Sequence, residues 1–580
     1  MFLINFEIMK RIFSVKRILF VVGACIFCTY SADADVRMPR IFGDHMVLQQ
    51  DTQLSVWGWA DPGEKVVVTL AGKKGKTVTG PDGTWKVCLK PVKTKSKGQT
   101  LTIKGKNTIV YKDVLVGDVW VASGQSNMEW GIKRKDYDND VNASADFLLR
   151  LFFLPKNTAL DPLSDIQIPE DTQNPEWAAK WVLCTPEALR KINGQGFASA
   201  AYYFARDIRK ANGRPLGIIQ SAWGGTRAEA WTSLSALKAE PKLKRYVDLY
   251  ERNVRINPEV VANYKQRKAE YDIAIKKWNN TVGKEWDRAQ KEWALQVKEA
   301  QAAGLPAPEK PKPSSPRPSD PPKPNGGNNG PSNLFNAMIS PLIPLSIKGV
   351  IWYQGEFNSG GSGKEYATLF PCMITDWRQK WGIGDFPFIY VQLPNFGPVD
   401  QKPSEEGQGW RWVREGQLKA LALPNTAMAV TIDIGDPFDL HPIDKYDVGH
   451  RLALAARNLA YGEKIVASGP LYESMTIEGN KAIINFSNCG SGLTIASSPY
   501  TPKGENPKLA TRLSGFCIAG EDHKFVWADA VIDGNQVIVS SPQVPRPVAV
   551  RYGFSNSPVC NLYNKELLPA SPFRTDNWEK

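Results

Sequence analysis

The sequence predicts an α/β fold in which a parallel sheet is flanked by helices, with additional all-β modules at both ends of the chain. Between residues 115 and 462, short apolar runs alternate with segments of helical periodicity, which is the pattern of a parallel sheet covered on both faces. Residues 35–114 and 463–580 instead contain short β-rich segments separated by turn residues. At 580 residues the chain is long enough for roughly three to four domains.

Residues 1–34 have the features of a signal peptide. Lys16 and Arg17 precede an apolar run from Ile18 to Tyr30, and Ala32-Asp33-Ala34 follows as a cleavage site. The run is too short for a spanning helix, which needs about 20 apolar residues. We therefore expect an exported protein, periplasmic or secreted, with no membrane span. The alternative is a lipid anchor at Cys25, because Val22-Gly23-Ala24-Cys25 resembles a bacterial lipoprotein box.

Charge and cysteine usage argue against two classes of partner. The net charge of +13 is spread along the chain without a Lys/Arg tract over the core motifs, so we expect a basic solvated surface and no nucleic-acid partner. Six cysteines follow the signal with no CxxC pair and no adjacent histidine, so we expect no metal site. Export permits disulfides, and both a bridge from Cys489 to Cys517 or Cys560 and buried free thiols stay open.

The two terminal modules are predicted from β-rich runs and turn signals. In residues 35–114 the runs are Leu54–Trp59, Lys65–Leu70 and Thr84–Leu89, with Pro62-Gly63 and Pro81-Asp82-Gly83 between them. In residues 463–580 they are Met475–Ile477, Lys481–Phe486, Val531-Ile532, Gln536–Val539 and Ala549–Tyr552. We expect a structural role for the first module in preference to sugar binding.

The central region, residues 115–462, supplies the elements of the parallel sheet. A strand begins at Gly117 and ends in a polar turn before Ser126. Further strands are predicted at Leu216–Ser221, Ile347–Tyr353, Phe386–Leu393 and Ala427–Asp433. Helices are predicted at Phe197–Asn212, Tyr366–Trp381, Arg414–Leu423 and Lys445–Tyr461.

An insertion at residues 246–331 interrupts this region. An aromatic residue recurs every seven or eight positions, at Tyr264, Tyr271, Trp278, Trp286 and Trp293, which places one aromatic stripe on a helix. The segment then becomes Pro-rich over Pro306–Pro324 and Gly/Asn-rich over Asn325–Gly330. We expect the stripe to pack against the body of the protein, tied back by the linker; a lid or an oligomer contact is the alternative.

Ser126 is the first candidate for chemistry. It lies just past a strand end, where α/β proteins place reactive groups, although Ser and Asn in such a turn also serve as helix caps. A serine nucleophile needs a base, and His441 follows another predicted strand through the turn Gly435–Leu440. Asp436 and Asp439 are near enough in sequence to orient its imidazole.

Two more strand ends supply donors for an oxyanion. Trp223-Gly224-Gly225 follows the strand that ends at Ser221, and glycine lets a backbone N–H face a ligand closely. Gln354–Asn358 follows the strand that ends at Tyr353, and the Asn358 side chain can donate. Four strand ends thus contribute Ser, Gly, Asn and His in order, which together predict an acyl-transfer site.

This order of residues resembles that of the SGNH (GDSL-like) hydrolases, and more narrowly that of the sialate O-acetylesterase family of carbohydrate esterases. The residues that carry the resemblance are Asp44–Gln49, Gly124–Trp130, Trp223–Thr226 with Glu229–Trp231, Leu334–Asn336, Trp352–Asn358, and Asp433–Asp436 with His441-Pro442. The resemblance makes residues 115–462 an SGNH hydrolase domain. It implies Ser126 as nucleophile, His441 as base, and an oxyanion hole formed by the N–H groups of Ser126 and Gly224 or Gly225 with the Asn358 side chain.

The family commonly places its acid three residues before the histidine, where this sequence has Phe438. Asp439 or Asp436 would have to serve, or the site works as a Ser–His dyad. We expect an O-acetylated sugar or glycan as substrate and no cofactor. Residues in or beside the motifs are expected to contact it: Gln125, Trp223, Arg227, Gln354 and Glu356. The motifs specify no oligomeric state.

Three other functions are alternatives to a sialate esterase. An acetyl-xylan or other polysaccharide deacetylase fits the same motifs. A carbohydrate-binding protein with a decayed site is disfavoured because Ser126 and His441 are both present. A lipase is disfavoured because Gly124-Gln125-Ser126-Asn127-Met128 is not a GxSxG elbow.

Overall fold

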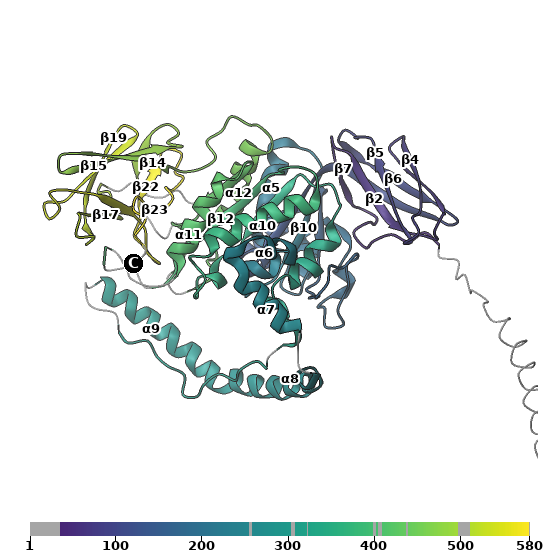
Figure 1. Cartoon of the computed structure of the whole chain (residues 1–580), viewed down its shortest axis with the longest axis horizontal. Helices are drawn as coiled ribbons and strands as arrows, with labels where there is room; N and C mark the ends of the chain where they lie inside the picture. The colour runs from purple at the N-terminus through teal and green to yellow at the C-terminus, as the bar shows by residue number, and fades with distance from the viewer. Residues whose placement is uncertain are drawn as a thin grey trace, which may run out of the picture.

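The structure is a computed structural model and describes residues 35–254, 258–302, 308–321, 323–397, 402–403, 409–436, 439–496 and 511–578. The predicted signal peptide, Cys25 and Phe438 lie outside these residues. Figure 1 shows a central α/β body between two β modules, the N-terminal one at its right and the C-terminal one at its left, with a long helical excursion below. The predicted fold class is therefore confirmed.

The central sheet is built around β7 (Thr108–Gly124). Its strand order is β13-β12-β11-β7-β10-β8-β9, and neighbours pair in parallel except β9 with β8. The other strands are β8 (Asp146–Phe153), β9 (Trp181–Cys184), β10 (Leu216–Ala222), β11 (Gly349–Tyr353), β12 (Phe388–Gln392) and β13 (Thr426–Val430). The four other predicted strands are present within a few residues as β10, β11, β12 and β13, whereas the sequence predicts neither β8 nor β9.

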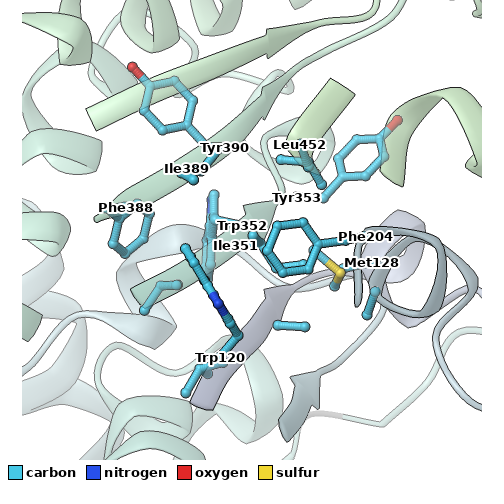
Figure 2. Close-up of a cluster of buried hydrophobic side chains, with 14 of the residues drawn as sticks. Trp120, Met128, Phe204, Ile351, Trp352, Tyr353, Phe388, Ile389, Tyr390 and Leu452 are labelled. Carbon is cyan, nitrogen blue, oxygen red and sulfur yellow. The ribbon is translucent and has the colours of Figure 1, made fainter. Parts of the chain in front are cut away.

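Helices cover both faces of this sheet. The longer ones are α5 (Ser199–Asn212), α10 (Tyr366–Trp381), α11 (Trp410–Lys419) and α12 (Lys445–Leu459), and α4 (Pro186–Lys191) is a short helix after β9. Trp120 of β7 packs edge-on against Phe204 of α5, with ring centroids 5.1 Å apart. Trp352 of β11, on the other face, stacks with Phe370 of α10. Figure 2 shows these indoles and Met128 in one continuous buried cluster, which fixes the strands whose ends carry the candidate residues.

The N-terminal module is joined to the sheet through β7 itself. The first part of β7 pairs with β6 (Lys95–Lys104), and the second part lies in the parallel sheet. The module also contains β1 (Val47–Gln49), β2 (Leu54–Trp59), β3 (Lys65–Leu70), β4 (Lys73–Val78) and β5 (Thr84–Leu89). The Gln49 side chain accepts the Val119 N–H (2.8 Å) and donates to Asp118 (3.2 Å). The motif around Gln49 thus serves to attach the module to the sheet.

The insertion begins with α7 (Lys244–Val254) and continues through α8 (Pro258–Trp278), a π-helical turn at Asn279–Gly283 and α9 (Lys284–Ala302). Three tryptophans of the predicted stripe donate their indole N–H groups to backbone carbonyls of the Pro-rich segment: Trp278 to Ser315 (3.1 Å), Trp286 to Pro311 (3.5 Å) and Trp293 to Pro308 (2.8 Å). The expectation that the stripe packs against the body is corrected, because the linker itself returns along the helix and covers these indoles.

The C-terminal module consists of short antiparallel strands. They are β14 (Leu471–Glu478), β15 (Lys481–Ser487), β16 (Leu493–Ile495), β17 (Phe516–Ala519), β18 (Val526–Trp527), β19 (Asp529–Asp533), β20 (Gln536–Ser540), β21 (Ala549–Tyr552), β22 (Leu562–Asn564) and β23 (Phe573–Arg574). Cys489 and Cys517 are unbridged buried thiols, so neither bridge from Cys489 is formed. Among the described residues, no helix is long and apolar enough to cross a membrane.

Candidate active site

The ends of three neighbouring strands lie level with one another. Gly124, at the end of β7, is paired with Ala222 of β10 on one side and Tyr353 of β11 on the other. The alignment continues past the strands, because the Gln125 N–H donates to the Tyr353 carbonyl (3.0 Å) and the Trp223 N–H donates to the Gly124 carbonyl (3.1 Å). The three polar turns that follow these strands are therefore gathered at one edge of the sheet, as the sequence predicts.

Only glycine fits at the turn that presents Ser126. Gly124 has φ +136°, and a Cβ there would lie 2.1 Å from the Tyr353 carbonyl oxygen. Ser126 is the first residue of α2 (Ser126–Glu129), and the side chain of Met128 anchors this short helix in the core. The opening N–H groups of a helix have no intrahelical acceptor, so the Ser126 amide is available to an oxyanion.

The structure brings the predicted nucleophile and base together. His441 Nε2 lies 2.9 Å from Ser126 Oγ, although the two residues are 315 positions apart in the sequence. The distance is that of a hydrogen bond, and it lets the imidazole accept the hydroxyl proton. The His441 side chain is 27% exposed, so a substrate can reach the pair.

The backbone on each side of His441 is held by buried side chains. Asn127 Nδ2 donates to the Leu440 carbonyl (3.0 Å), and Lys445 Nζ donates to the Pro442 carbonyl. The two side chains also bond each other, with Lys445 Nζ donating to Asn127 Oδ1 (2.8 Å). Since Asn127 directly follows the serine in the chain, the same residue positions the nucleophile turn and the histidine loop.

Trp130 supports the imidazole of His441. Their rings are stacked at 4.9 Å between centroids and 19° between planes. The Arg134 guanidinium lies 3.9 Å from the Trp130 ring centroid, a cation–π contact. Trp130 and Lys445 are site residues that the sequence did not assign to the imidazole. Trp130 is the last residue of the motif Gly124–Trp130, and this position could have identified it. No local feature of the sequence predicts that Lys445 is buried beside the site.

Asp439 is the carboxylate nearest to the His441 imidazole among the two predicted acids. Its Oδ1 accepts the His441 backbone N–H (2.8 Å) and lies 3.6 Å from His441 Nδ1, beyond a normal hydrogen bond. Burial alone would raise the pKa of Asp439, but hydrogen bonds and charge from His441 and the charge of Lys445 lower it. Asp436 Oδ1 accepts the Asp439 N–H (3.3 Å), which places it as a support for the turn. The geometry is closer to a Ser–His dyad than to a tight triad.

Glu356 is a buried carboxyl group in contact with Asn127, the residue that follows the nucleophile. Its Oε1 accepts a hydrogen bond from Asn127 Nδ2 (2.5 Å), and its Oε2 has no partner among the described residues. Burial raises the pKa of Glu356, while burial lowers the pKa of Lys445 to about 7. Glu356, expected to contact the sugar, is only 5% exposed and instead supports Asn127. That expectation is therefore corrected.

The predicted oxyanion donor Gly224 is already engaged. Its N–H donates to Glu129 Oε2 (2.6 Å), because the buried Glu129 carboxylate takes the nearest donors, and Lys156 Nζ also lies 2.5 Å from Glu129 Oε1. The expectation is corrected for Gly224, although this glycine does lie against Ser126: a Cβ added to it would be 3.1 Å from the serine Cβ. The N–H groups of Ser126 and Gly225 stay as predicted donors.

Asn358 is held in an interior network. Its Nδ2 donates to Glu229 Oε2 (2.9 Å), and its Oδ1 accepts from the Ala228 N–H (3.0 Å) and from Gln354 Nε2 (2.7 Å). Burial raises the pKa of Glu229. Asn358 is itself fully buried, and within the described residues one hydrogen of its amide has no acceptor. Gln354 is fully buried, with its amide also donating to the Thr226 carbonyl (3.1 Å), so it supports Asn358 and is corrected as a sugar contact.

Two predicted sugar contacts, Trp223 and Arg227, are partly exposed, whereas Gln125 is only 2% exposed and is corrected as a sugar contact, because its side chain supports the turn after β11. Gln125 Oε1 accepts the Phe357 N–H (3.2 Å), and the Arg227 guanidinium lies 5.0 Å from the exposed Phe357 ring. Within the described part of the chain, Arg227 Nε is buried and has no hydrogen-bond partner. Trp223 is half-buried, with Lys156 Nζ 5.8 Å from its ring centroid. In the described residues, no group of three His, Cys, Asp or Glu is placed to hold a metal ion.

Comparisons with known proteins find carbohydrate acetylesterases among the relatives of this chain. A family model described as "Carbohydrate esterase, sialic acid-specific acetylesterase" matches residues 329–458. The sialate O-acetylesterase of Mus musculus is 28% identical, with 94% of this chain and 95% of that protein covered. That of Homo sapiens is 29% identical, with 95% of each covered. The crystal structure of a carbohydrate acetylesterase from Xanthomonas citri has a TM-score of 0.70 and 34% identity, covering 94% of this chain and 100% of that one.

Proposed function

The chain belongs to the sialate O-acetylesterase family of carbohydrate esterases, and on that premise we propose that it is an exported esterase that removes O-acetyl groups from sugars. The observation that supports this most directly is the 2.9 Å distance from His441 Nε2 to Ser126 Oγ, beyond the carboxyl ends of the central strands. A serine esterase of this kind needs no organic cofactor.

In the proposed mechanism Ser126 Oγ attacks the acetyl carbonyl carbon while His441 Nε2 takes the hydroxyl proton. The carbonyl oxygen becomes an oxyanion, for which the predicted donors are the N–H groups of Ser126 and Gly225 and the second amide hydrogen of Asn358. When the tetrahedral intermediate collapses, the bond between the acetyl carbon and the sugar oxygen breaks. The sugar oxygen takes the proton from His441 Nε2 and leaves as a hydroxyl group. Water then attacks the acetyl-enzyme with His441 as base, and acetate and the free serine result.

The test is hydrolysis of 4-nitrophenyl acetate by the wild type and by Ser126→Ala. We expect the variant to lose at least about a thousandfold in kcat/KM, as removal of a nucleophile does. Ser123→Ala is the matched control, because Ser123 is a buried serine of β7, the strand that precedes Ser126, and its hydroxyl has no partner among the described residues. Equal, slow hydrolysis by all three proteins, with acetylated sugars also intact, would support the alternative of a decayed carbohydrate-binding protein.

For the substrate we propose O-acetylated sialic acid, which carries a carboxylate. Arg227 supports this choice because its Nε is buried beside the exposed Phe357 ring and has no hydrogen-bond partner among the residues that the structure describes, and guanidinium groups bind carboxylates in two-point contacts. We expect Arg227→Gln to raise KM for O-acetyl sialic acid by about tenfold and to leave 4-nitrophenyl acetate hydrolysis unchanged. Acetylated xylan is a neutral substrate, so its KM should not depend on Arg227. An equal rise in its KM with Arg227→Gln favours the alternative of a polysaccharide deacetylase.

For localisation we propose export through the signal peptide at residues 1–34, with cleavage after the small residues at Ala32-Asp33-Ala34. The N-terminal residue of the mature protein distinguishes cleavage there from lipidation at Cys25. Cleavage predicts a free amino terminus near residue 35 and no change with Cys25→Ser. A membrane-associated mature protein that Cys25→Ser releases would instead identify a lipoprotein.

A further inference from the structure

A second cavity lies between the N-terminal module and the α/β body. Its volume is about 800 Å³, within the range of small-molecule sites in proteins. One wall is formed by β2 and β5, and the other by residues 160–164 and 340–344, Lys380 at the end of α10, and Tyr250 of α7. None of the lining residues belongs to the site around Ser126. Domain junctions of this kind are frequent places for ligand sites.

Two tryptophans form the β wall. Trp57 and Trp59 are separated by one residue on β2, so both side chains lie on the same face of the strand. Both are only half-buried, while the intervening Gly58 is buried. Trp57 packs edge-on against Phe42 with centroids 4.7 Å apart, and the Arg37 guanidinium lies 5.6 Å from the Trp59 centroid. The indoles are thus held in place and still border the open cavity.

The polar groups of the cavity come from both walls. Lys86 is the cross-strand partner of Trp57, and Thr84 is that of Trp59. On the opposite wall lie Lys380, Asp161 and Ser164. The charged residues that line the cavity are thus two lysines, one on each wall, and one aspartate, and in the described part of the chain neither lysine forms an ion pair. The charge of Lys380 also acts on Asp376, which lies one turn before it on α10. The cavity therefore favours a ligand with an apolar face, hydroxyl groups and a negative charge.

We propose that this cavity binds a carboxylated sugar unit of an oligosaccharide. The C–H face of a pyranose stacks on the indoles of Trp57 and Trp59, since a large flat ring offers apolar area at little entropic cost. The sugar carboxylate lies toward Lys86 and Lys380, and the hydroxyls meet the polar side chains. A nonulosonate and a uronate share this chemistry. The site holds glycan without esterase chemistry, so the inference does not depend on hydrolysis at Ser126.

The experiment measures binding to the full chain carrying Ser126→Ala, which prevents turnover. Isothermal titration calorimetry compares 3′-sialyllactose, a glucuronic-acid-bearing xylo-oligosaccharide and lactose as the neutral control. We expect at least one of the two acidic ligands to bind more tightly than lactose. We expect Trp59→Ala to weaken that binding by at least about fivefold, and Lys380→Gln to weaken it by about threefold and to reduce its dependence on salt.

Matched controls are available in the C-terminal module. Trp527 is 49% exposed, and Lys481 is an exposed residue of β15. Trp527→Ala and Lys481→Gln should leave the binding unchanged. Trp59→Ala, made in the chain that retains Ser126, should keep the wild-type rate with 4-nitrophenyl acetate, which shows that the body is intact.

Each outcome decides the proposal. Binding of sialyllactose alone identifies a nonulosonate, and binding of the xylo-oligosaccharide alone identifies a uronate. The proposal is overturned if neither acidic ligand binds, if lactose binds equally well, or if Trp59→Ala and Lys380→Gln leave affinity unchanged. An inactive esterase that still binds an acidic sugar through Trp59 would overturn the proposed function and not this inference.

Discussion

The loop of His441 and the helix face of His450 contain similar residues arranged for different purposes. His450 Nδ1 lies 2.8 Å from Asp207 Oδ2, and Arg206 pairs with the same carboxylate at 2.9 Å. His441 Nδ1 lies 3.6 Å from Asp439 Oδ1. Judged by the histidine–carboxylate distance alone, His450 has the better geometry for a catalytic pair.

The contacts of the second ring nitrogen, Nε2, instead favour His441 as the catalytic histidine. His441 Nε2 contacts Ser126 Oγ, and within the described residues no other histidine ring bonds a hydroxyl group. His45 also has a close carboxylate, with Nδ1 2.8 Å from Asp113 Oδ2, in the N-terminal module. A well-formed histidine–aspartate pair is therefore a common way to satisfy a surface imidazole, and the nucleophile marks the site.

The two regions should differ most in how much activity is lost when the imidazole is removed. His441→Ala should reduce kcat/KM for 4-nitrophenyl acetate by at least about a thousandfold, because Ser126 loses its base. His450→Ala should leave the rate within about twofold of the wild type. The comparison fails if the two variants lose activity to a similar degree while both remain folded by circular dichroism.

A smaller loss is expected from the side chains that hold the His441 loop. Lys445→Met removes the donor to Asn127 Oδ1 and to the Pro442 carbonyl. A displaced base should lower kcat by about 10- to 100-fold with KM nearly unchanged. Lys348→Met is a matched control, because Lys348 makes a cation–π contact with Tyr461 away from the site. A kcat equal to the wild type in Lys445→Met would remove Lys445 as a positioning residue.

These contacts show how far the sequence could specify the site. The strand ends were predictable, because an apolar strand followed by glycine and small polar residues is a local pattern, as at Gly124 and Ser126. Gly224 was assigned to the oxyanion, but the structure gives its N–H to Glu129, and Glu356 and Gln354 were assigned to the sugar although both are buried. Which partner a buried polar group selects depends on residues far away in the chain, and no local spacing encodes it.

The insertion also shows what a local pattern can predict and what it cannot. The spacing of Trp278, Trp286 and Trp293 correctly places the indoles on one helical stripe. It does not say what covers the stripe, because each indole N–H finds a carbonyl 15 to 37 residues away in a segment without periodicity. A period identifies the face of an element, whereas the partner of that face is a tertiary property.

The next prediction concerns the long contact of Asp439. A buried aspartate in a tight triad contributes about 10⁴ in kcat. Asp439 is 52% exposed in its side chain and 3.6 Å from the imidazole, so Asp439→Asn should lower kcat by less than about tenfold. The measurement is the rate of acetate release at saturating substrate. A loss of a thousandfold or more would mean that substrate binding shortens the contact into a working triad.

The smallest expected effect on activity comes from Asp207, whose role is in stability. Burial alone would raise its pKa, but hydrogen bonds and charge from His450 and Arg206 lower it below the ordinary 3.8. Asp207→Asn should leave kcat unchanged and reduce the free energy of unfolding by about 1.5 to 3 kcal/mol at pH 7, the range for hydrogen bonds to a charged group.

The pH dependence follows from the sign of that shift. Because the folded pKa of Asp207 is below the unfolded value of 3.8, its stabilisation is complete above pH 3.8 and is lost as the pH falls through the folded pKa. Thermal unfolding should therefore show a difference between the wild type and Asp207→Asn that is largest near neutral pH and narrows in acid. A difference that widens in acid, or a loss of esterase activity at pH 7, would contradict the purely structural role that separates His450 from His441.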